Sequence, residues 1–105
     1  MRRPLPKQYL PAQLRATSQL VTFINDHNGA APEEILLCLS ALESDDIDKA
    51  VKYAKKVKPF GMGSLTDWVP DIVSEKETDS GVEAELDRLV RSWCDLMSRS
   101  FPEYS

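Results

Sequence analysis

The C-terminal third of this 105-residue chain carries the pattern that most constrains its fold. Its apolar side chains recur at steps of four, three, four and three residues, at Val82, Leu86, Leu89, Trp93 and Leu96. This spacing places all five on one side of an α-helix. Two heptads are too few to specify a coiled coil, so we expect a helix over 81–99 that packs its apolar seam into a bundle.

Three earlier segments show the same helical spacing, over 11–27, 32–43 and 45–58. Residues 32–43 are the most apolar of them, so we expect this segment to be the central and most buried helix. No stretch of useful length alternates apolar and polar residues as a half-buried strand does. The sequence therefore predicts an all-α fold: a single-domain bundle of four main helices over residues 11–105, preceded by an extended basic arm over 1–10.

Short polar and glycine residues indicate where these helices begin and end. Gly29 is suited to the left-handed conformation that commonly follows the last turn of a helix. Ser44 or Asp45 is expected to cap the third helix. Ser80 and Glu83 have the spacing of a capping box, which predicts the start of the last helix at residue 81.

The stretch "KPFGMGSLTDWVPD", residues 58–71, separates the third and fourth helices. Its glycines fit neither the G-x-x-x-x-G-K-[ST] nor the G-x-G-x-x-G spacing of a nucleotide-binding loop, and no strand precedes them. We expect an irregular turn, then a short helical turn over 64–69 with Ser64 as its cap and Asp67 in its first turn. The apolar side chains of the stretch are expected to cover the end of the bundle as a lid, namely Phe60, Met62, Leu65 and Trp68.

Charge is unevenly divided along the chain, whose formal net charge is −4. Residues 1–58 carry 9 basic and 7 acidic side chains, whereas residues 59–105 carry 4 and 10. The third helix has a row of lysines that would suit an acidic partner, at Lys49, Lys52, Lys55 and Lys56. The acidic half offers a surface for a basic partner, and as a further alternative the two surfaces satisfy each other, either within the fold or across a homodimer.

Several chemistries lack the residues that they need. His27 is the only histidine and is expected to be a helix-end cap or a surface group, and no motif marks a nucleophile. Cys38 and Cys94 are expected to be reduced thiols that pack as small hydrophobes. We predict no catalytic site, no metal and no cofactor. The acidic isoelectric point, near 4.9, argues against nucleic acid, and the absence of a long apolar run argues against a membrane span, so a cytoplasmic protein is expected.

The segment "FGMGSLTDWV" resembles a family of small uncharacterised bacterial helical proteins. Members share a G-M-G-S-[LF]-[NT]-D stretch, followed by a variable loop and a Leu-rich final helix, and the resemblance covers about the last half of this chain. The matching residues are Gly61, Met62, Gly63, Ser64, Leu65, Thr66 and Asp67. Thr66 stands where members usually carry Asn. The family has no assigned activity that the resemblance could carry over, but by analogy of style, and not through the motif, small acidic helical proteins of this kind often serve as immunity proteins against toxins.

These observations predict a non-enzymatic protein-interaction module, most concretely an immunity-type protein that neutralises a cognate toxin by occlusion. The predicted partner-binding residues are Gly61, Gly63, Ser64, Asp67, Trp68, Glu75, Glu77, Asp79 and Glu83. The alternative is a small-ligand or anion-binding regulatory domain that uses the Gly61–Ser64 turn. In that alternative Lys56 and Lys58 supply positive charge and Trp68 supplies an aromatic wall.

Overall fold

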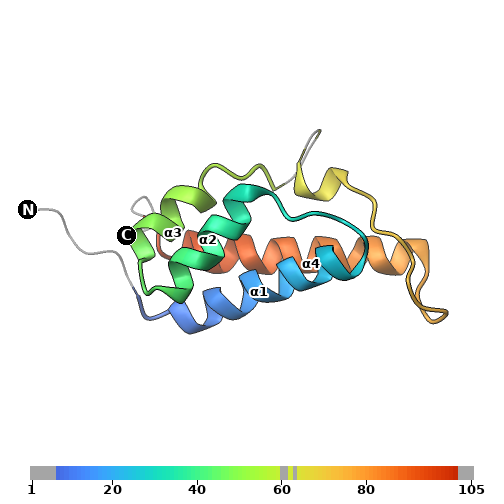
Figure 1. Ribbon diagram of the computed structural model, residues 1–105, viewed down its shortest axis with the longest axis horizontal. Coiled ribbons are helices and arrows are strands. Elements are labelled where there is room, and N and C mark those ends of the chain that lie inside the picture. The colour runs from blue at the N-terminus through green and yellow to red at the C-terminus, as the bar shows by residue number, and fades with distance from the viewer. Residues whose placement is uncertain (1–6, 60–61, 63, 102–105) are drawn as a thin grey trace, which may run out of the picture.

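A computed structural model of the chain describes residues 7–59, 62 and 64–101, and it is all-α (Figure 1). The helices are α1 (Leu10–Asp26), α2 (Glu33–Glu43), α3 (Ile47–Ala54) and α4 (Asp79–Ser98), with a 3₁₀ turn, η1 (Leu65–Asp67), between the last two. No strand occurs among these described residues, which confirms the predicted fold class. The predicted arm falls mostly on residues 1–6, outside the described residues, and Leu10 already belongs to α1.

The two longest helices form the base of the bundle. Figure 1 shows α1 and α4 side by side along the molecule, with α2 and α3 packed together over one half of this pair. η1 rests against α4 beyond the end of α3. The segment after η1 then runs to the end of the molecule at which α4 begins.

The buried face of α4 confirms most of the predicted seam. Val82, Leu86, Leu89 and Trp93 are buried, but the last core position belongs to Met97 and Leu96 is only half-buried. A straight helix has 3.6 residues per turn, so an exact seven-residue repeat drifts around it and the last contact moves by one residue. The core cluster to which this face belongs also contains fully buried side chains of α1 and α2, among them Leu20, Ile35, Cys38 and Leu42.

The prediction that the second helix is the most buried was wrong. Leu36 is 45% exposed and Leu37 is 37% exposed, although both belong to the most apolar segment of the chain. α2 packs mainly on α3 and α1, so only one of its faces meets the core. High apolar content therefore did not indicate burial on all sides.

The third helix is shorter than predicted. Asp46, and neither Ser44 nor Asp45, caps it, because the Asp46 carboxylate accepts a hydrogen bond of 3.2 Å from the Lys49 amide. Asp45 instead takes a left-handed backbone conformation with φ of 60° in the turn after α2. α3 ends at Ala54, so the lysines that follow lie in a turn and a connecting segment.

The fourth helix begins two residues before its predicted start. Thr78 is its cap, and the Thr78 hydroxyl accepts a hydrogen bond of 3.0 Å from the Gly81 amide. Ser80 therefore lies inside the first turn, and the predicted capping box of Ser80 and Glu83 was wrong. Thr78 has the extended backbone of an N-cap residue, with φ of −127° and ψ of 159°.

Replacing Thr78 by alanine should lower the free energy of unfolding by about 1 kcal/mol, because the Gly81 amide loses its acceptor. Ser80→Ala is the matched control and should change the free energy of unfolding by less than about 0.5 kcal/mol. Urea denaturation followed by helical circular dichroism measures both. A larger loss from Ser80→Ala than from Thr78→Ala would contradict this assignment of the cap.

Candidate functional site

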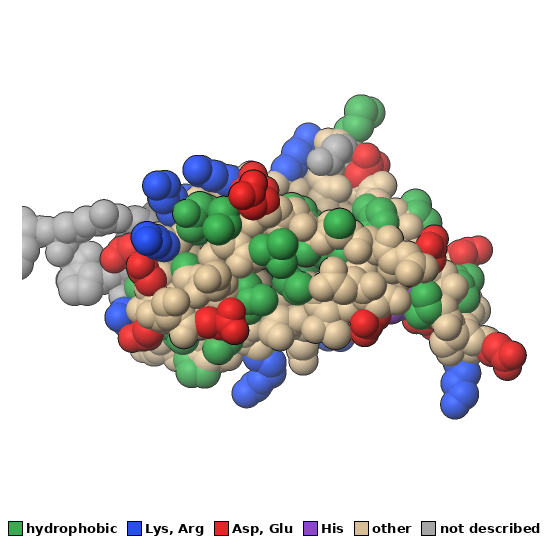
Figure 2. Space-filling model, in the orientation of Figure 1, with side chains coloured by type: hydrophobic (Ala, Val, Ile, Leu, Met, Phe, Trp, Pro, Cys, Tyr) green, Lys and Arg blue, Asp and Glu red, His purple; other side chains and the backbone are tan. Residues whose placement is uncertain are grey.

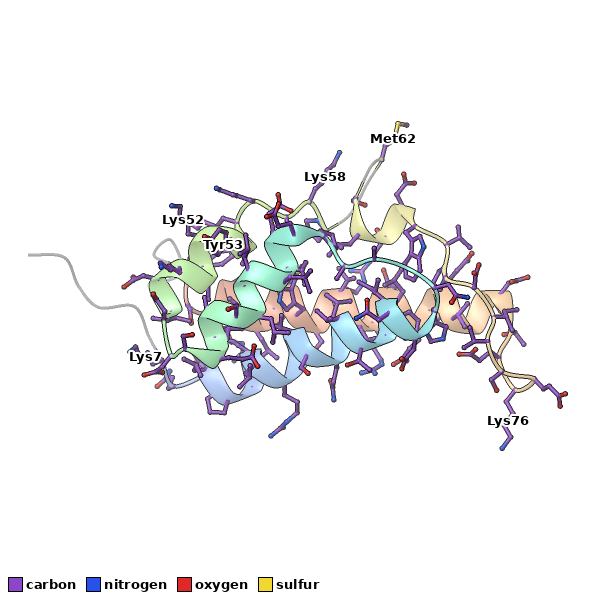
Figure 3. The ribbon with its side chains drawn as sticks, viewed as in Figure 1. Lys7, Lys52, Tyr53, Lys58, Met62 and Lys76 are labelled. Atoms are coloured by element: carbon purple, nitrogen blue, oxygen red, sulfur yellow. The ribbon has the colours of Figure 1, made fainter. Side chains whose placement is uncertain are left out.

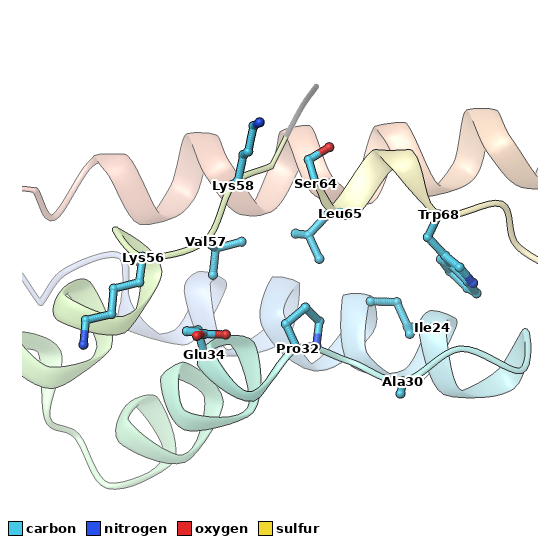
Figure 4. A pocket seen from close by; sticks show the side chains of 10 residues that line it. All are labelled: Ile24, Ala30, Pro32, Glu34, Lys56, Val57, Lys58, Ser64, Leu65 and Trp68. Atoms are coloured by element: carbon cyan, nitrogen blue, oxygen red, sulfur yellow. The ribbon is translucent and has the colours of Figure 1, made fainter. Parts of the chain in front are cut away.

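One hollow lies between the end of α1 with the start of α2 and the segment 56–68 (Figure 4). Its volume is about 380 Å³, and we call it the groove. It is lined by Ile24, Ala30, Pro32, Glu34, Lys56, Val57, Lys58, Ser64, Leu65 and Trp68. Two walls that are distant in sequence thus form one site.

Backbone hydrogen bonds hold the second wall in shape. The Leu65 amide donates to the Lys58 carbonyl at 3.0 Å, and both the amide and the hydroxyl of Thr66 donate to the Pro59 carbonyl, at 3.2 and 3.1 Å. Ser64 precedes η1 as predicted, but its side chain makes no capping hydrogen bond, and its hydroxyl lies 3.4 Å from the Thr66 hydroxyl. Thr66 thus helps to close this turn with both its backbone and its side chain.

Trp68 forms the aromatic end of the groove and packs on Gly29. A Cβ atom added to Gly29 would lie 2.5 Å from Trp68 Cζ2 and 2.8 Å from Ile24 Cγ2. Gly29 was predicted to take the left-handed conformation, but Asn28 does so instead, with φ of 64°, and Gly29 does not. The glycine is needed because the indole ring approaches its backbone closely.

The predicted lid is confirmed for two of its four side chains. Leu65 is buried in the core and Trp68 packs against it. Met62 was expected to help cover the end of the bundle, but its side chain is 86% exposed, and Figure 3 shows it directed away from the helices. Phe60 lies outside the described residues, as do two of the predicted partner-binding residues, Gly61 and Gly63.

The groove combines an apolar floor with a cationic end. Ile24, Val57 and Leu65 supply the floor, and Figure 4 shows Lys56 and Lys58 leaving the groove at the end away from Trp68. The Lys58 ammonium donates a hydrogen bond of 2.7 Å to the Met62 carbonyl. With two lysines against Glu34, the lining has a net positive charge.

The lysine row predicted as a basic patch is exposed throughout. Figures 2 and 3 show Lys and Arg side chains gathered near α3, with Lys52 directed outward. Lys55 lies 5.3 Å from the centre of the Phe101 ring and Lys56 lies 5.8 Å from that of Tyr53. Of the four residues in the row, Lys56 alone lines the groove, so the groove and the row are distinct surfaces that share one residue.

The predicted acidic residues do not belong to the groove. Glu75, Asp79 and Glu83 are exposed around the start of α4, whereas Glu77 is half-buried and faces α1. Asp67, in η1, is exposed but does not line the groove. The structure therefore separates Ser64 and Trp68 from the acidic residues with which the sequence analysis grouped them.

The partner of Glu77 is His27, which occupies the C-cap position of α1, as one of its two predicted roles required, and is not a surface group. His27 is only 7% exposed, its Nε2 lies 2.6 Å from Glu77 Oε2, and its Nδ1 lies 2.8 Å from the Phe23 carbonyl. The hydrogen bond to Glu77 is the main cause that raises the pKa of His27, and the same bond lowers the pKa of Glu77. The two residues are 50 positions apart, so no local sequence signal indicated the pair.

Neither cysteine is activated as a nucleophile. Burial raises the pKa of the Cys38 thiol to about 12 and that of the Cys94 thiol to about 11. Both are free, as predicted, and Cys38 packs as a buried hydrophobe. Over residues 7–59, 62 and 64–101 we find no cluster of metal-ligating side chains, and no helix there is both long and apolar enough to span a membrane.

No protein-family model, no curated protein and no solved structure matches this chain.

Proposed function

We propose that this chain is a non-enzymatic protein-binding module whose groove receives an apolar side chain from an acidic segment of a partner protein. The observation that supports this proposal is the union, in one hollow, of an apolar floor and two lysines. Protein interfaces concentrate their binding energy in a few anchor side chains that fill desolvated pockets. Charges at the rim then favour partners of complementary sign and raise the association rate.

The size and the edge of the groove suit such an anchor. A volume of about 380 Å³ accommodates one large side chain with part of its flanking backbone. Trp68 offers an aromatic surface, and aromatic residues are enriched in interface cores. Met62, exposed next to Lys58, adds a flexible apolar contact that can adapt to a partner.

The most specific form of the proposal is an immunity-type protein that occludes a cognate toxin. The residues that carry the family resemblance overlap the groove, because Ser64 and Leu65 belong to both. A toxin encoded beside this gene would supply the partner. Co-expression should then prevent growth arrest by that toxin, and a variant with a blocked groove should not.

A second function remains as an alternative, a regulatory domain that binds a small ligand or anion. One observation favours it: the groove brings together Ser64, Lys56, Lys58 and Trp68, the residues that the sequence analysis combined for such a site. Under this alternative, a thermal-shift screen with small carboxylates and phosphates should show stabilisation that Ser64→Ala removes. Under protein binding, the same screen should give no stabilisation.

Selection of a random peptide library against the protein tests the protein-binding proposal. The selected peptides should carry an aromatic or aliphatic anchor flanked by Asp or Glu. The charge-reversed variant Lys56→Glu/Lys58→Glu should bind them at least about tenfold more weakly, about 1.4 kcal/mol, by fluorescence anisotropy. Ala30→Trp should also abolish binding, because Ala30 is exposed, lines the groove and would place a large ring in it.

Lys49→Glu/Lys52→Glu is the matched control, because it makes the same change of charge on exposed lysines that do not line the groove. It should reduce the affinity only slightly, through long-range electrostatics that salt screens. An equal loss in both double variants would assign binding to the lysine row. Selected peptides without acidic residues would contradict the proposed partner chemistry.

A further inference from the structure

The contact between His27 and Glu77 joins two segments that are far apart in sequence. His27 follows the last residue of α1, and Glu77 lies just before α4, in the segment 69–78. Further bonds reach the same segment: the Asp71 amide donates to the His27 carbonyl at 3.4 Å, and the Asn28 side chain donates to the Asp71 carboxylate at 3.1 Å. The end of α1 therefore contacts both ends of the segment 69–78.

With Glu77 ionised, as its lowered pKa indicates, the hydrogen-bond partners specify the charge of the imidazole. A carbonyl oxygen only accepts, so the Nδ1 of His27 must donate to the Phe23 carbonyl. An ionised carboxylate also only accepts, so Nε2 must donate to Glu77. Both ring nitrogens therefore carry a proton, and the contact is a charge-assisted hydrogen bond from an imidazolium.

The surrounding charges favour the same state. Asp26 precedes His27 on α1, and its negative charge also raises the pKa of the imidazole. Asp71 lies across the Asn28 side chain, and Glu85 of α4 and Lys76 line a hollow together with Phe23 and Glu77. Glu77 and Asp26 are thus the carboxylates that raise the pKa of the ring, Glu85 is paired with Arg88, and the Phe23 ring, stacked at a centroid distance of 4.0 Å, shields one face of the imidazole.

We propose that His27 and Glu77 form a proton-operated clamp, which holds the segment 69–78 against the end of α1 while His27 is protonated and loosens it when His27 is neutral. Neutral His27 has one proton for two acceptors, so it must give up the bond either to Glu77 or to the Phe23 carbonyl. The Glu77 carboxylate also accepts a hydrogen bond of 2.9 Å from the Val73 amide through its other oxygen. Loss of the imidazolium therefore weakens the fold of the whole segment.

The pH range of the clamp follows from the two directions of shift. The pKa of His27 is raised above 6.5, so its stabilising effect is complete below about pH 6.5 and is lost as the pH rises through the raised value. The pKa of Glu77 is lowered below 4.5, so its effect is complete above about pH 4.5 and is lost as the pH falls through the lowered value. The clamp is thus fully closed between about pH 4.5 and 6.5 and opens on the alkaline side.

The clamp is positioned to regulate the groove, an inference that rests on the proposed binding function. Trp68, at the end of the groove, packs on Gly29, and Asp71, three residues further on, is bound by His27 and Asn28. Both contacts use the same corner of the chain, residues 27–29. Opening of the clamp is therefore expected to loosen the wall that Trp68 forms and to weaken peptide binding.

Because the chain has a single histidine, an NMR titration of its imidazole protons observes the clamp directly. The midpoint should lie above pH 6.5, and the amide signals of Asp71 and Val73 should shift with the same midpoint. The Lys49 amide, which is bound to Asp46, is the control and should not follow. In Glu77→Gln, the His27 midpoint should fall toward 6.5, and the movement of the Asp71 and Val73 amides should disappear.

A wild-type midpoint at or below pH 6.5 would overturn the clamp, and so would Asp71 and Val73 amides that do not titrate with His27. His27→Gln removes the imidazole itself but replaces a buried side chain. Glu77→Gln alters a partly exposed side chain, so it still tests the clamp if His27→Gln does not fold. For the link to the groove, the affinity for a selected peptide should fall several-fold from pH 6 to pH 8.5 in wild type and not in Glu77→Gln. If no peptide is selected, the proposed function fails while the titration still decides the clamp.

Discussion

Replacing Gln13 by alanine should lower the free energy of unfolding by roughly 2–4 kcal/mol, the largest effect that we expect from a polar residue of this chain. Gln13 is 0% exposed, and its Nε2 donates hydrogen bonds of 2.8 Å both to the Leu96 carbonyl and to the Ser100 hydroxyl. These contacts connect the first turn of α1 to the last turn of α4. The last carbonyls of a helix have no hydrogen-bond partner within the helix. The Gln13 side-chain amide therefore gives the Leu96 carbonyl a donor that it would otherwise lack in the buried core.

Two consequences of Gln13→Ala add together, and a second variant separates them. Alanine leaves both a cavity and an unbonded Leu96 carbonyl, whereas Gln13→Met fills the space and removes only the hydrogen bonds. Methionine also removes Gln13 Oε1, a buried acceptor without a partner. We therefore expect Gln13→Met to cost about 1–2 kcal/mol, less than alanine. Urea denaturation followed by circular dichroism measures both, and a Gln13→Met protein as stable as wild type would show that the bonds contribute nothing.

Gln13 also illustrates what helical spacing predicts and what it omits. The spacing of apolar residues identified four helices because a helix buries one face at a fixed period. The same reasoning treats a glutamine as a solvent-exposed residue. Its partners lie 83 and 87 positions away, at the opposite end of the chain, so nothing near Gln13 indicates them. Leu36 and Leu37 show the converse. They are apolar residues that the same reasoning treats as buried, but they are exposed because of where α2 lies in the bundle.

The candidate site could be predicted from the sequence along one wall only. Lys56, Lys58, Ser64 and Trp68 are close in sequence, so their nearness in space followed from a short turn. The facing wall, residues 24–34, comes from the end of α1 and the start of α2, and its position depends on how the helices pack. The sequence did not predict the position of Glu77 either, because its distance from the groove and its bond to His27 both depend on the tertiary structure.

Gly29→Ala is the second substitution with a large expected effect and should lower the free energy of unfolding by about 1–3 kcal/mol. The added Cβ would lie within 3 Å of two atoms of the Trp68 ring and of Ile24 Cγ2. Contacts this short force the indole ring to move away from the core. The emission of Trp68, read in a Trp93→Phe background, should shift to longer wavelength as its ring becomes more exposed.

The double variant Gly29→Ala/Trp68→Ala decides whether space or backbone conformation makes the glycine necessary. Trp68→Ala alone should destabilise the protein, because the ring packs against the core. If crowding by the ring is the main cause, Gly29→Ala should cost much less once the ring is absent, with only the contact to Ile24 Cγ2 left, which is a non-additive result. If a left-handed conformation were the cause, the cost would persist in the double variant. Since Asn28, and not Gly29, has the positive φ, we expect most of the cost to disappear.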